Sequence, residues 1–239
     1  SGIAGLFAAL KAADNGKVTV ISKRSADECN TRYAQGGIAC VIAEGDSFEA
    51  HVQDTLRAGA GLCDPDVVRE FVSEGPSCIQ DLLDLGIHFT RREELGEEGS
   101  ADAEATEFDL GREGGHSHRR VLHAGDVTGQ EIVRVLLERC REDPRIEILE
   151  DHIAVDLIST RHLFYHDVNA CLGAYVLDRQ TMQVKTFLSP FTILATGGAG
   201  KVYLYTSNPD VASGDGVAMV YRAFGEIRNM EFFQFHPTC

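Results

Sequence analysis

The spacing of apolar and polar residues changes several times along the chain, and each change marks an expected element. Residues 2–13 are small and apolar at helical spacing, and VTVIS at 18–22 has the profile of a short buried strand. Helical spacing returns at 47–58, from 65 to about 85, and at 128–141. Strand-like runs follow at 146–149, 153–158, 172–177, 184–188 and 191–195. This order predicts an α/β fold whose mixed sheet combines a parallel core with a meander.

Local chemistry indicates where two of these helices begin and end. Ser47 is a plausible N-cap, and Asp64 followed by Pro65 suits the start of the next helix, because Asp accepts from free N–H groups and Pro fits the first turn. We expect that helix to carry an irregularity at 75–76 (Gly-Pro) and to stop at Gly86. Residues 91–111 are acidic, small and without period, which predicts an exposed or mobile loop.

Composition narrows the class of protein. The 239 residues carry a formal net charge of -15, which disfavours binding to nucleic acid or to an anionic membrane. The 44% hydrophobic content is enough for a sizeable core. Seven scattered cysteines without C-x-x-C spacing favour reduced thiols in a cytosol. No signal segment and no membrane-spanning run is apparent, and no nucleic-acid or membrane partner is expected.

Both ends of the chain interrupt motifs. SGIAG begins inside a glycine fingerprint whose first glycine and preceding strand would lie upstream, and NMEFFQFHPTC stops inside another motif. We therefore interpret the sequence as an N-terminal fragment.

The first glycine motif indicates a nucleotide site. Gly2 and Gly5 supply the last two glycines of G-x-G-x-x-G, where the first allows a pyrophosphate to approach and the second allows helix and sheet to pack. The same pattern is equally typical of a helix that packs through small residues. A nicotinamide cofactor is disfavoured, because Lys23 follows the strand where an acidic ribose ligand would be expected.

Two further glycine-rich runs strengthen this interpretation. LATGGAG at 194–200 follows a strand-like run, and its adjacent glycines Gly197 and Gly198 allow a backbone to pass close to a ligand. SGDG at 213–216 leads into a helix, where Asp215 is either a capping carboxylate or a partner for a cofactor hydroxyl. Three such elements in this order favour a flavin dinucleotide.

Five motifs then carry a resemblance to a known family. They are NTRYAQGGIA (30–39), REGGHSHRRVLHAGDVTG (112–129), LATGGAGKVY (194–203), NPDVASGDG (208–216) and NMEFFQFHPT (229–238). Together they resemble the succinate dehydrogenase/fumarate reductase flavoprotein family, in its L-aspartate oxidase branch. The resemblance implies a Rossmann-like FAD-binding domain over 1–230 and the start of a capping domain at 231–239.

The resemblance also implies the cofactor contacts. FAD would be held by Ser1, Gly2, Gly5, Lys23, Asn30, Thr31, Tyr33, Ala34, Gln35, Gly36, Gly37, Ile153, Ala154, Gly197, Gly198 and Asp215. The dehydrogenase branch attaches FAD through a histidine in the loop before A-Q-G-G. Asn30 stands at that position here, so a noncovalent FAD is expected.

The cluster at 112–123 supports three interpretations. A metal site is suggested by His116, His118 and His123, but three neighbouring arginines would repel a divalent cation, each by about 4 kcal/mol at close range. A solvated basic loop is the plainer alternative. The paired glycines and the arginines favour a third, a site for a small dicarboxylate. Glu113, held ionised by its cationic neighbours, would then receive an ammonium, which points to aspartate.

The implied substrate contacts extend beyond this cluster. Glu113, His236 and Gln234 are the expected catalytic residues, and His116 and Arg119 are placed with Glu113 and His236 around the substrate. His236 could instead be a structural histidine before Pro237, and His118 could simply brace the loop. No metal is expected, and the family's remaining arginine and histidine ligands would follow Cys239.

The implied reaction is FAD-dependent oxidation of L-aspartate to iminoaspartate, the first step of NAD biosynthesis. Oxygen or fumarate would be the acceptor, and quinolinate synthase the metabolic partner that uses the unstable product. The location would be cytoplasmic in a bacterium or plastid in a plant or alga. Two alternatives stay open: a fumarate reductase or succinate dehydrogenase flavoprotein, and a truncated nucleotide-binding fragment without catalytic activity. Under the main interpretation too, the fragment alone is expected to be inactive.

Overall fold

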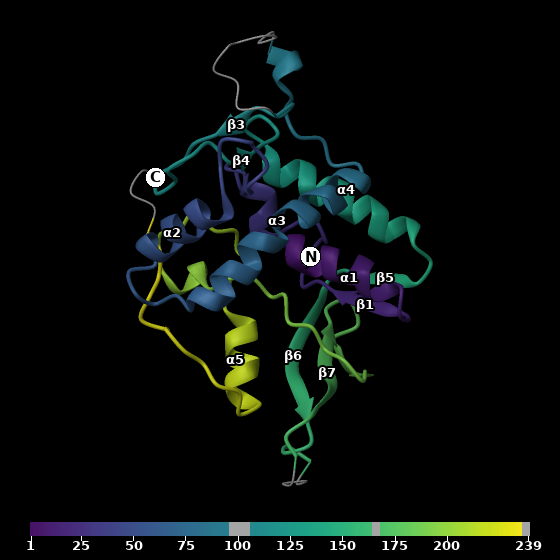
Figure 1. Cartoon of the computed structure of the whole chain (residues 1–239). Helices are drawn as coiled ribbons and strands as arrows, with labels where there is room; N and C mark the ends of the chain where they lie inside the picture. Colours follow the sequence, from purple (N-terminus) through teal and green to yellow (C-terminus); the bar gives the residue numbers. More distant parts are fainter. Residues whose placement is uncertain (96–105, 164–167, 236–239) are drawn as a thin grey trace. The chain divides into compact units, whose positions relative to one another are not determined.

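The chain, in a computed structural model, is described over residues 1–95, 106–163 and 168–235 (Figure 1). It divides into two compact units. The first comprises Ser1–Arg32 and Leu136–Cys239, and the second comprises Tyr33–Val135. This division lies elsewhere than the domain boundary expected at residue 231, which stays a prediction.

The first unit opens with the helix and strand predicted from the glycine motif. Helix α1 (Ile3–Ala13) buries its small and apolar side, and β1 (Val18–Ile21) follows after a short turn. Strand β1 pairs in parallel with β5 (Ile146–Leu149). Helix α4 (Thr128–Glu142) begins in the second unit and leads into β5 in the first. The predicted parallel pairing is confirmed.

A meander completes the described sheets of the first unit. Strands β6 (His152–Ser159), β7 (Cys171–Asp178) and β8 (Gln183–Leu188) are antiparallel neighbours in that order. Helix α5 (Asp215–Arg222) packs against them. The core of this layer is formed by Leu157, Ala174, Val176 and Met219. The predicted meander is therefore also confirmed.

Helices α2 (Phe48–Ala58) and α3 (Pro65–Asp84) pack against each other in the second unit. Both predicted caps form, because Ser47 Oγ accepts from the N–H of Ala50 and Asp64 accepts from two N–H groups of the first turn. Gly86 follows α3 with a left-handed φ of 99°, as expected of a helix stop. The irregularity expected at 75–76 is absent, since α3 runs through Pro76 without a break.

A small antiparallel sheet in the second unit was not predicted. Its order is β2 (Ile38–Ala39), β4 (Val121–Leu122) and β3 (Leu110–Gly111). Strands of two residues are too short to give a periodic signal. A side chain at Gly37 would overlap the carbonyl of Leu122, so this glycine permits the close approach of β2 to β4.

One expected strand is wrong, and the segment expected to be a loop at 91–111 differs from that expectation only at its described ends. Residues 191–195 form no strand in the described structure, and Phe191 and Ile193 are 84% and 64% exposed. The apolar composition of this stretch is typical of a strand, but a strand is defined by backbone pairing with a neighbour, and this stretch has none among the described residues. The ends of the 91–111 loop are ordered: a 3-10 helix, η2 (Arg92–Leu95), opens it and buried Phe108 closes it. Residues 96–105 lie outside the described part.

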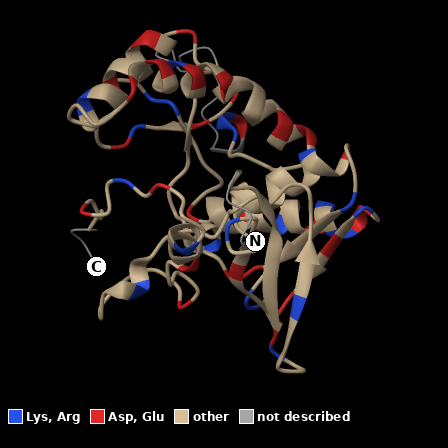
Figure 2. Cartoon of the chain, turned by 90° about the horizontal axis from the view of Figure 1, so that it is seen from below, with Lys and Arg blue, Asp and Glu red and all other residues tan. Residues whose placement is uncertain are grey.

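The state of the cysteines and the excess of acidic residues are as the composition indicates. The described cysteines are all free, and burial raises the pKa of Cys40 to about 12 and that of Cys140 to about 11. Acidic positions outnumber basic ones along the ribbon (Figure 2). Across the described ranges, no group of side chains could hold a metal ion, and none of the helices combines the length and the apolar character of a bilayer span.

Candidate functional site

The N-terminus of α1 carries the glycine motif, in the first unit. Gly2 is the N-cap in an extended conformation and no side chain caps the helix from that position. Thr31 lies beside it: its Oγ1 accepts from the N–H of Ile3 at 3.1 Å, and a Cβ at Gly2 would come within 3.0 Å of the same oxygen. A Cβ at Gly5 would lie 3.3 Å from the Cβ of Ala195, so this glycine permits close packing, as expected.

Asn30 faces the second glycine motif, also in the first unit. It begins the 3-10 helix η1 (Asn30–Tyr33), and its Nδ2 lies 3.8 Å from the position of a Cβ on Gly197 and 4.0 Å from that on Gly198. Gly197 has a left-handed φ of 70°. The Oδ1 of Asn30 is buried without a hydrogen-bond partner, which is costly unless a ligand supplies a donor. These features fit a bound cofactor that brings a donor to Asn30.

Lys23 and Asp215 meet although 192 residues separate them. The Nζ of Lys23 lies 2.6 Å from Asp215 Oδ2 and also contacts the hydroxyl of Ser213. Burial alone would raise the pKa of Asp215, but hydrogen bonds from Lys23 and Ser213 outweigh it and hold this pKa below its ordinary value. Asp215 is the first residue of α5, and Gly214 rather than Asp215 is the N-cap of that helix. The described partners of Asp215 are Lys23 and Ser213, so its contact with a cofactor hydroxyl stays a prediction.

An open hollow of about 350 Å³ lies at this pair. It is lined by Lys23, Arg24, Ile153, Arg179, Asp210, Val211, Ser213 and Asp215. Three of these, Lys23, Ile153 and Asp215, were expected at the cofactor. Arg179 was missed; its guanidinium donates to the carbonyl of Lys23 and to Asp151, which fixes the backbone after β1.

In the second unit, Glu113 lies beside the A-Q-G-G segment. A Cβ added to Gly36 would sit 3.1 Å from Oε1 of Glu113. Both residues are exposed, as are Tyr33, Ala34 and Gln35. The structure thus brings together two residues that sequence reasoning had assigned separately, one to the substrate and one to the cofactor.

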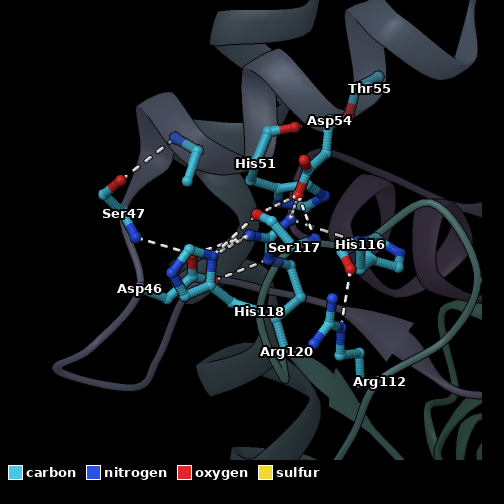
Figure 3. A network of polar contacts seen from close by, with 11 residues as sticks. Asp46, Ser47, His51, Asp54, Thr55, Arg112, His116, Ser117, His118 and Arg120 are labelled. Carbon is cyan, nitrogen blue, oxygen red and sulfur yellow. Dashed lines mark hydrogen bonds and ion pairs between the residues drawn. The ribbon is translucent and has the colours of Figure 1, made fainter.

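Arg120 is the centre of a buried polar network in the same unit (Figure 3). Its side chain is completely buried, with Nε and Nη2 at 2.7 and 2.8 Å from the carboxylate of Asp46. Nη1 donates to Asp54 Oδ2 at 2.8 Å, and the same oxygen accepts from the N–H and the hydroxyl of Ser117, each at 2.7 Å. Hydrogen bonds and charge from these partners lower the pKa of both carboxyls against the opposing effect of burial.

This network corrects the expectation that three arginines form a free cationic pocket. Arg120 is neutralised by its two aspartates. Arg112 donates to the carbonyl of His116, and Arg119 to the carbonyl of Leu110. The arginines mainly shape the loop, and the local excess of positive charge is smaller than the sequence suggests.

The histidines of the cluster surround the same guanidinium. The Nδ1 of His116 lies 3.3 Å from Arg120 Nη1, and the Nδ1 of His118 lies 2.8 Å from Ser117 Oγ. His123 instead pairs with Asp109 at 3.0 Å. His51 of α2 is buried near His116, with ring centroids 5.6 Å apart. The three histidines weighed as metal ligands do not form a metal site among the described residues.

The acids and His51 of the network were missed from sequence. A signal existed in α2, where His51, Val52 and Asp54 occupy its buried positions, so polar residues interrupt the apolar side. Gln234 is exposed in an irregular stretch of the first unit, next to the aromatic contact of Phe233 with Phe235. His236 lies outside the described residues, so its expected role stays a prediction.

The glycine motifs, the buried and unpartnered Oδ1 of Asn30, and the combination of parallel and antiparallel sheets define a class, that of dinucleotide-binding flavoprotein domains. The FAD binding domain family matches residues 1–239, and the chain belongs to this family. FAD is accordingly its cofactor, and the resemblance noted from the motifs is confirmed at the level of the family.

Curated relatives point to one branch. The chain is 51% identical over its whole length to L-aspartate oxidase 1 of Ralstonia nicotianae and covers 43% of that protein. It is 50% identical to L-aspartate oxidase of Vibrio cholerae, again covering 43%, and 46% identical to the chloroplastic L-aspartate oxidase of Arabidopsis thaliana, covering 35%. The chain thus spans less than half the length of these relatives.

Solved structures agree on the fold. The FrdA chain of E. coli quinol fumarate reductase matches with a TM-score of 0.80 and 31% identity, over 92% of this chain and 35% of FrdA. Mycobacterium smegmatis Sdh1 matches with a TM-score of 0.78 and 29% identity, over 93% of this chain and 37% of Sdh1. The fold is that of the succinate dehydrogenase/fumarate reductase flavoproteins, as expected.

Proposed function

We propose that the complete protein oxidises L-aspartate to iminoaspartate with FAD, and that oxygen or fumarate reoxidises the cofactor. The observation that carries this proposal is the exposed carboxylate of Glu113 beside Gly36, in a chain about half identical to L-aspartate oxidases. An amino-dicarboxylate needs one anionic contact for its ammonium and several donors for its carboxylates. Glu113 is the anion, and His116 and Arg119 lie on the same loop as candidate donors.

The FAD contacts are proposed residue by residue. Ser1, Gly2, Gly5 and Thr31 surround the N-terminus of α1, where free N–H groups favour an anion such as a pyrophosphate. Lys23, Ile153 and Asp215 line the hollow, with Ala154 next along β6. Asn30, Gly197 and Gly198 form a second contact region, and residues 33–37 a third. When bound, FAD would supply the acceptor for the two electrons of the Cα–H bond, while the amine loses a proton and the Cα–N bond becomes that of an imine.

The cofactor is proposed to be held without a covalent bond. Asn30 occupies the place where related dehydrogenases are expected to carry a linking histidine, and an amide cannot form that bond. The orphan Oδ1 of Asn30 supports a hydrogen bond to the cofactor instead.

The protein's remaining contribution is placement of the substrate. Glu113 would hold the ammonium while donors on the loop hold a carboxylate, which orients Cα toward the cofactor. His236 and Gln234 are proposed to act from the segment that begins the capping domain at 231–239. The product imine is unstable in water, so an enzyme that consumes it, such as quinolinate synthase, is the proposed metabolic partner.

An anaerobic flavin experiment tests the function. We would express the complete gene, record the flavin spectrum without oxygen, and add L-aspartate to one sample and succinate to another. Bleaching by L-aspartate alone is the expected result. Bleaching by succinate alone would overturn the proposal and favour the fumarate reductase/succinate dehydrogenase alternative. Solved structures of that class are 29–31% identical to this chain. No bleaching by either, with FAD bound, would leave only a nucleotide-binding protein.

A further inference from the structure

Two histidines of the loop at 112–119 have different polar neighbours, although only Ser117 separates them in the sequence. Each uses Nδ1 for its contacts, and none of the hydrogen bonds among the described residues engages the Nε2 of either ring. What Nδ1 contacts therefore decides what each Nε2 offers to a ligand, because a neutral imidazole has one donor and one acceptor nitrogen.

His116 faces a donor. Its Nδ1 lies 3.3 Å from Nη1 of Arg120, whose guanidinium carries hydrogens on every nitrogen and accepts none. Nη1 has two hydrogens, and Asp54 takes one at 2.8 Å. The second is available to His116, so Nδ1 of His116 is an acceptor and its Nε2 carries the hydrogen.

His118 faces a hydroxyl whose hydrogen is already used. Ser117 Oγ lies 2.7 Å from Asp54 Oδ2, and an ionised carboxylate can only accept. Ser117 must therefore donate its single hydrogen to Asp54. The 2.8 Å contact between Ser117 Oγ and His118 Nδ1 then requires a hydrogen from the imidazole.

The other neighbours of His118 divide. Asp46 Oδ1 lies 3.5 Å from the same Nδ1 and favours a hydrogen there, whereas Arg120 Nη2 at 3.4 Å opposes it. The 2.7 and 2.8 Å contacts decide the balance, because two oxygens or an oxygen and a nitrogen so close repel strongly without a hydrogen between them. Ionisation of Asp54 is secured by Arg120 and Ser117, which hold its pKa well below the ordinary value.

We propose that Asp54 and Arg120 are positioning residues that fix His116 and His118 in opposite tautomers. The loop then presents one Nε2–H donor, on His116, and one Nε2 acceptor, on His118. Resting on the proposed function, this pair matches an amino-dicarboxylate: the donor suits a carboxylate oxygen and the acceptor suits an ammonium hydrogen. The acceptor would supplement Glu113, and a substrate without an amino group would gain nothing from it.

Histidine-selective ¹⁵N labelling of the full-length holoenzyme tests the assignment directly. Long-range proton–nitrogen correlations distinguish a protonated from an unprotonated ring nitrogen, and His116→Gln and His118→Gln identify the two sets of signals. We expect a hydrogen on Nε2 of His116 and on Nδ1 of His118. The same tautomer on both rings would overturn the proposal, whatever the activity of the enzyme.

A substitution of Ser117, whose hydroxyl relays the effect of Asp54 to His118, provides a second test. Ser117→Ala removes the hydroxyl between Asp54 and His118, so we expect His118 to lose its Nδ1–H preference while His116 keeps its tautomer. Ser77→Ala, an exposed serine of α3, is the matched control and should change neither ring. An unchanged His118 in Ser117→Ala would refute the relay. If that variant does not fold, the wild-type spectrum still decides the assignment.

Failure of this inference is distinguishable from failure of the function. A holoenzyme that shows opposite tautomers but does not react with L-aspartate would retain the positioning pair and refute the substrate. Rapid reduction of the flavin by L-aspartate, in an enzyme whose two histidines have the same tautomer, would support the substrate and refute the positioning pair.

Discussion

The carboxylate of Glu113 lies directly over the backbone of Gly36: a methyl group placed on that glycine would be 3.1 Å from Glu113 Oε1. The contact joins the loop at 112–119 to the A-Q-G-G segment within the second unit. The glycine has no positive φ to require it, and its Cβ position is crowded only by the end of this flexible glutamate.

Gly36→Ala should displace Glu113 without unfolding the protein. The exposed end of the glutamate can move by a few tenths of an ångström, so the free energy of unfolding should change by less than about 0.5 kcal/mol. We expect the KM for L-aspartate to rise about fivefold, equivalent to roughly 1 kcal/mol. Gly16→Ala, at a glycine with no atom near its Cβ position, is the control. Steady-state kinetics and FAD titration of both variants would separate substrate from cofactor effects.

Glu113→Gln should weaken recognition of the ammonium selectively. A hydrogen bond to a charged group contributes about 1.5–3 kcal/mol, so the apparent affinity for L-aspartate should fall about 10- to 100-fold. Binding of succinate, which lacks the amino group, should change little or improve. Glu44→Gln is a matched control at another exposed acid. Titration of the flavin spectrum with each ligand measures both affinities, and equal losses for the two ligands would contradict the assigned role.

Local chemistry accounts for what the sequence predicted well. Ser47 and Asp64 cap their helices through contacts two or three residues away, and Gly2 and Gly5 act through backbone geometry. Such signals are visible along the chain. The stretch at 191–195 misled because composition indicates a strand while pairing depends on a neighbour.

The buried network around Arg120 could not be predicted, because its contacts join residues that are far apart in the sequence. Arg120 finds its aspartates 74 and 66 residues away, and no local pattern links them. Lys23 and Asp215 are even farther apart, by 192 residues, although the family resemblance implied that both contact the cofactor. Pairs of residues that lie far apart in the sequence are therefore predicted only where a whole motif resembles a known family, and the aspartate partners of Arg120 belong to no such motif.

Denaturation should release the flavin intact. With Asn30 in place of a linking histidine, acid precipitation is expected to leave FAD in the supernatant and a colourless pellet. Asn30→Ala should also weaken the binding of FAD, because the buried Oδ1 of Asn30 would no longer accept a hydrogen bond from the cofactor. A loss of about 1 kcal/mol in binding free energy corresponds to a roughly fivefold rise in Kd. Fluorescence titration of the apoprotein measures this. Yellow protein after denaturation would contradict the noncovalent assignment.

Removal of Arg120 should destabilise the second unit strongly. Arg120→Met leaves the carboxylates of Asp46 and Asp54 buried without their cation, and breaking a buried pair in this way costs about 3–5 kcal/mol. Arg69→Met, which breaks an exposed pair in α3, should cost no more than about 1 kcal/mol. Urea unfolding of the full-length protein, followed by circular dichroism, compares the two. A cost for Arg120→Met as small as that of the control would show that the network adds little stability.

The same network gives stability a definite dependence on pH. The folded pKa values of Asp46 and Asp54 lie below the ordinary value of 3.8, so below about pH 5 the unfolded chain binds more protons than the folded one. Stability from these carboxyls is complete above the ordinary pKa and is lost as pH falls through it toward the folded values. In Arg120→Met the folded pKa values move upward, because the cation is gone while burial remains. We therefore expect the acid-side loss of unfolding free energy between pH 5 and pH 3 to be smaller in the variant than in the wild type. Parallel urea titrations across that range measure both slopes, and an equal slope would mean that Arg120 does not set these pKa values.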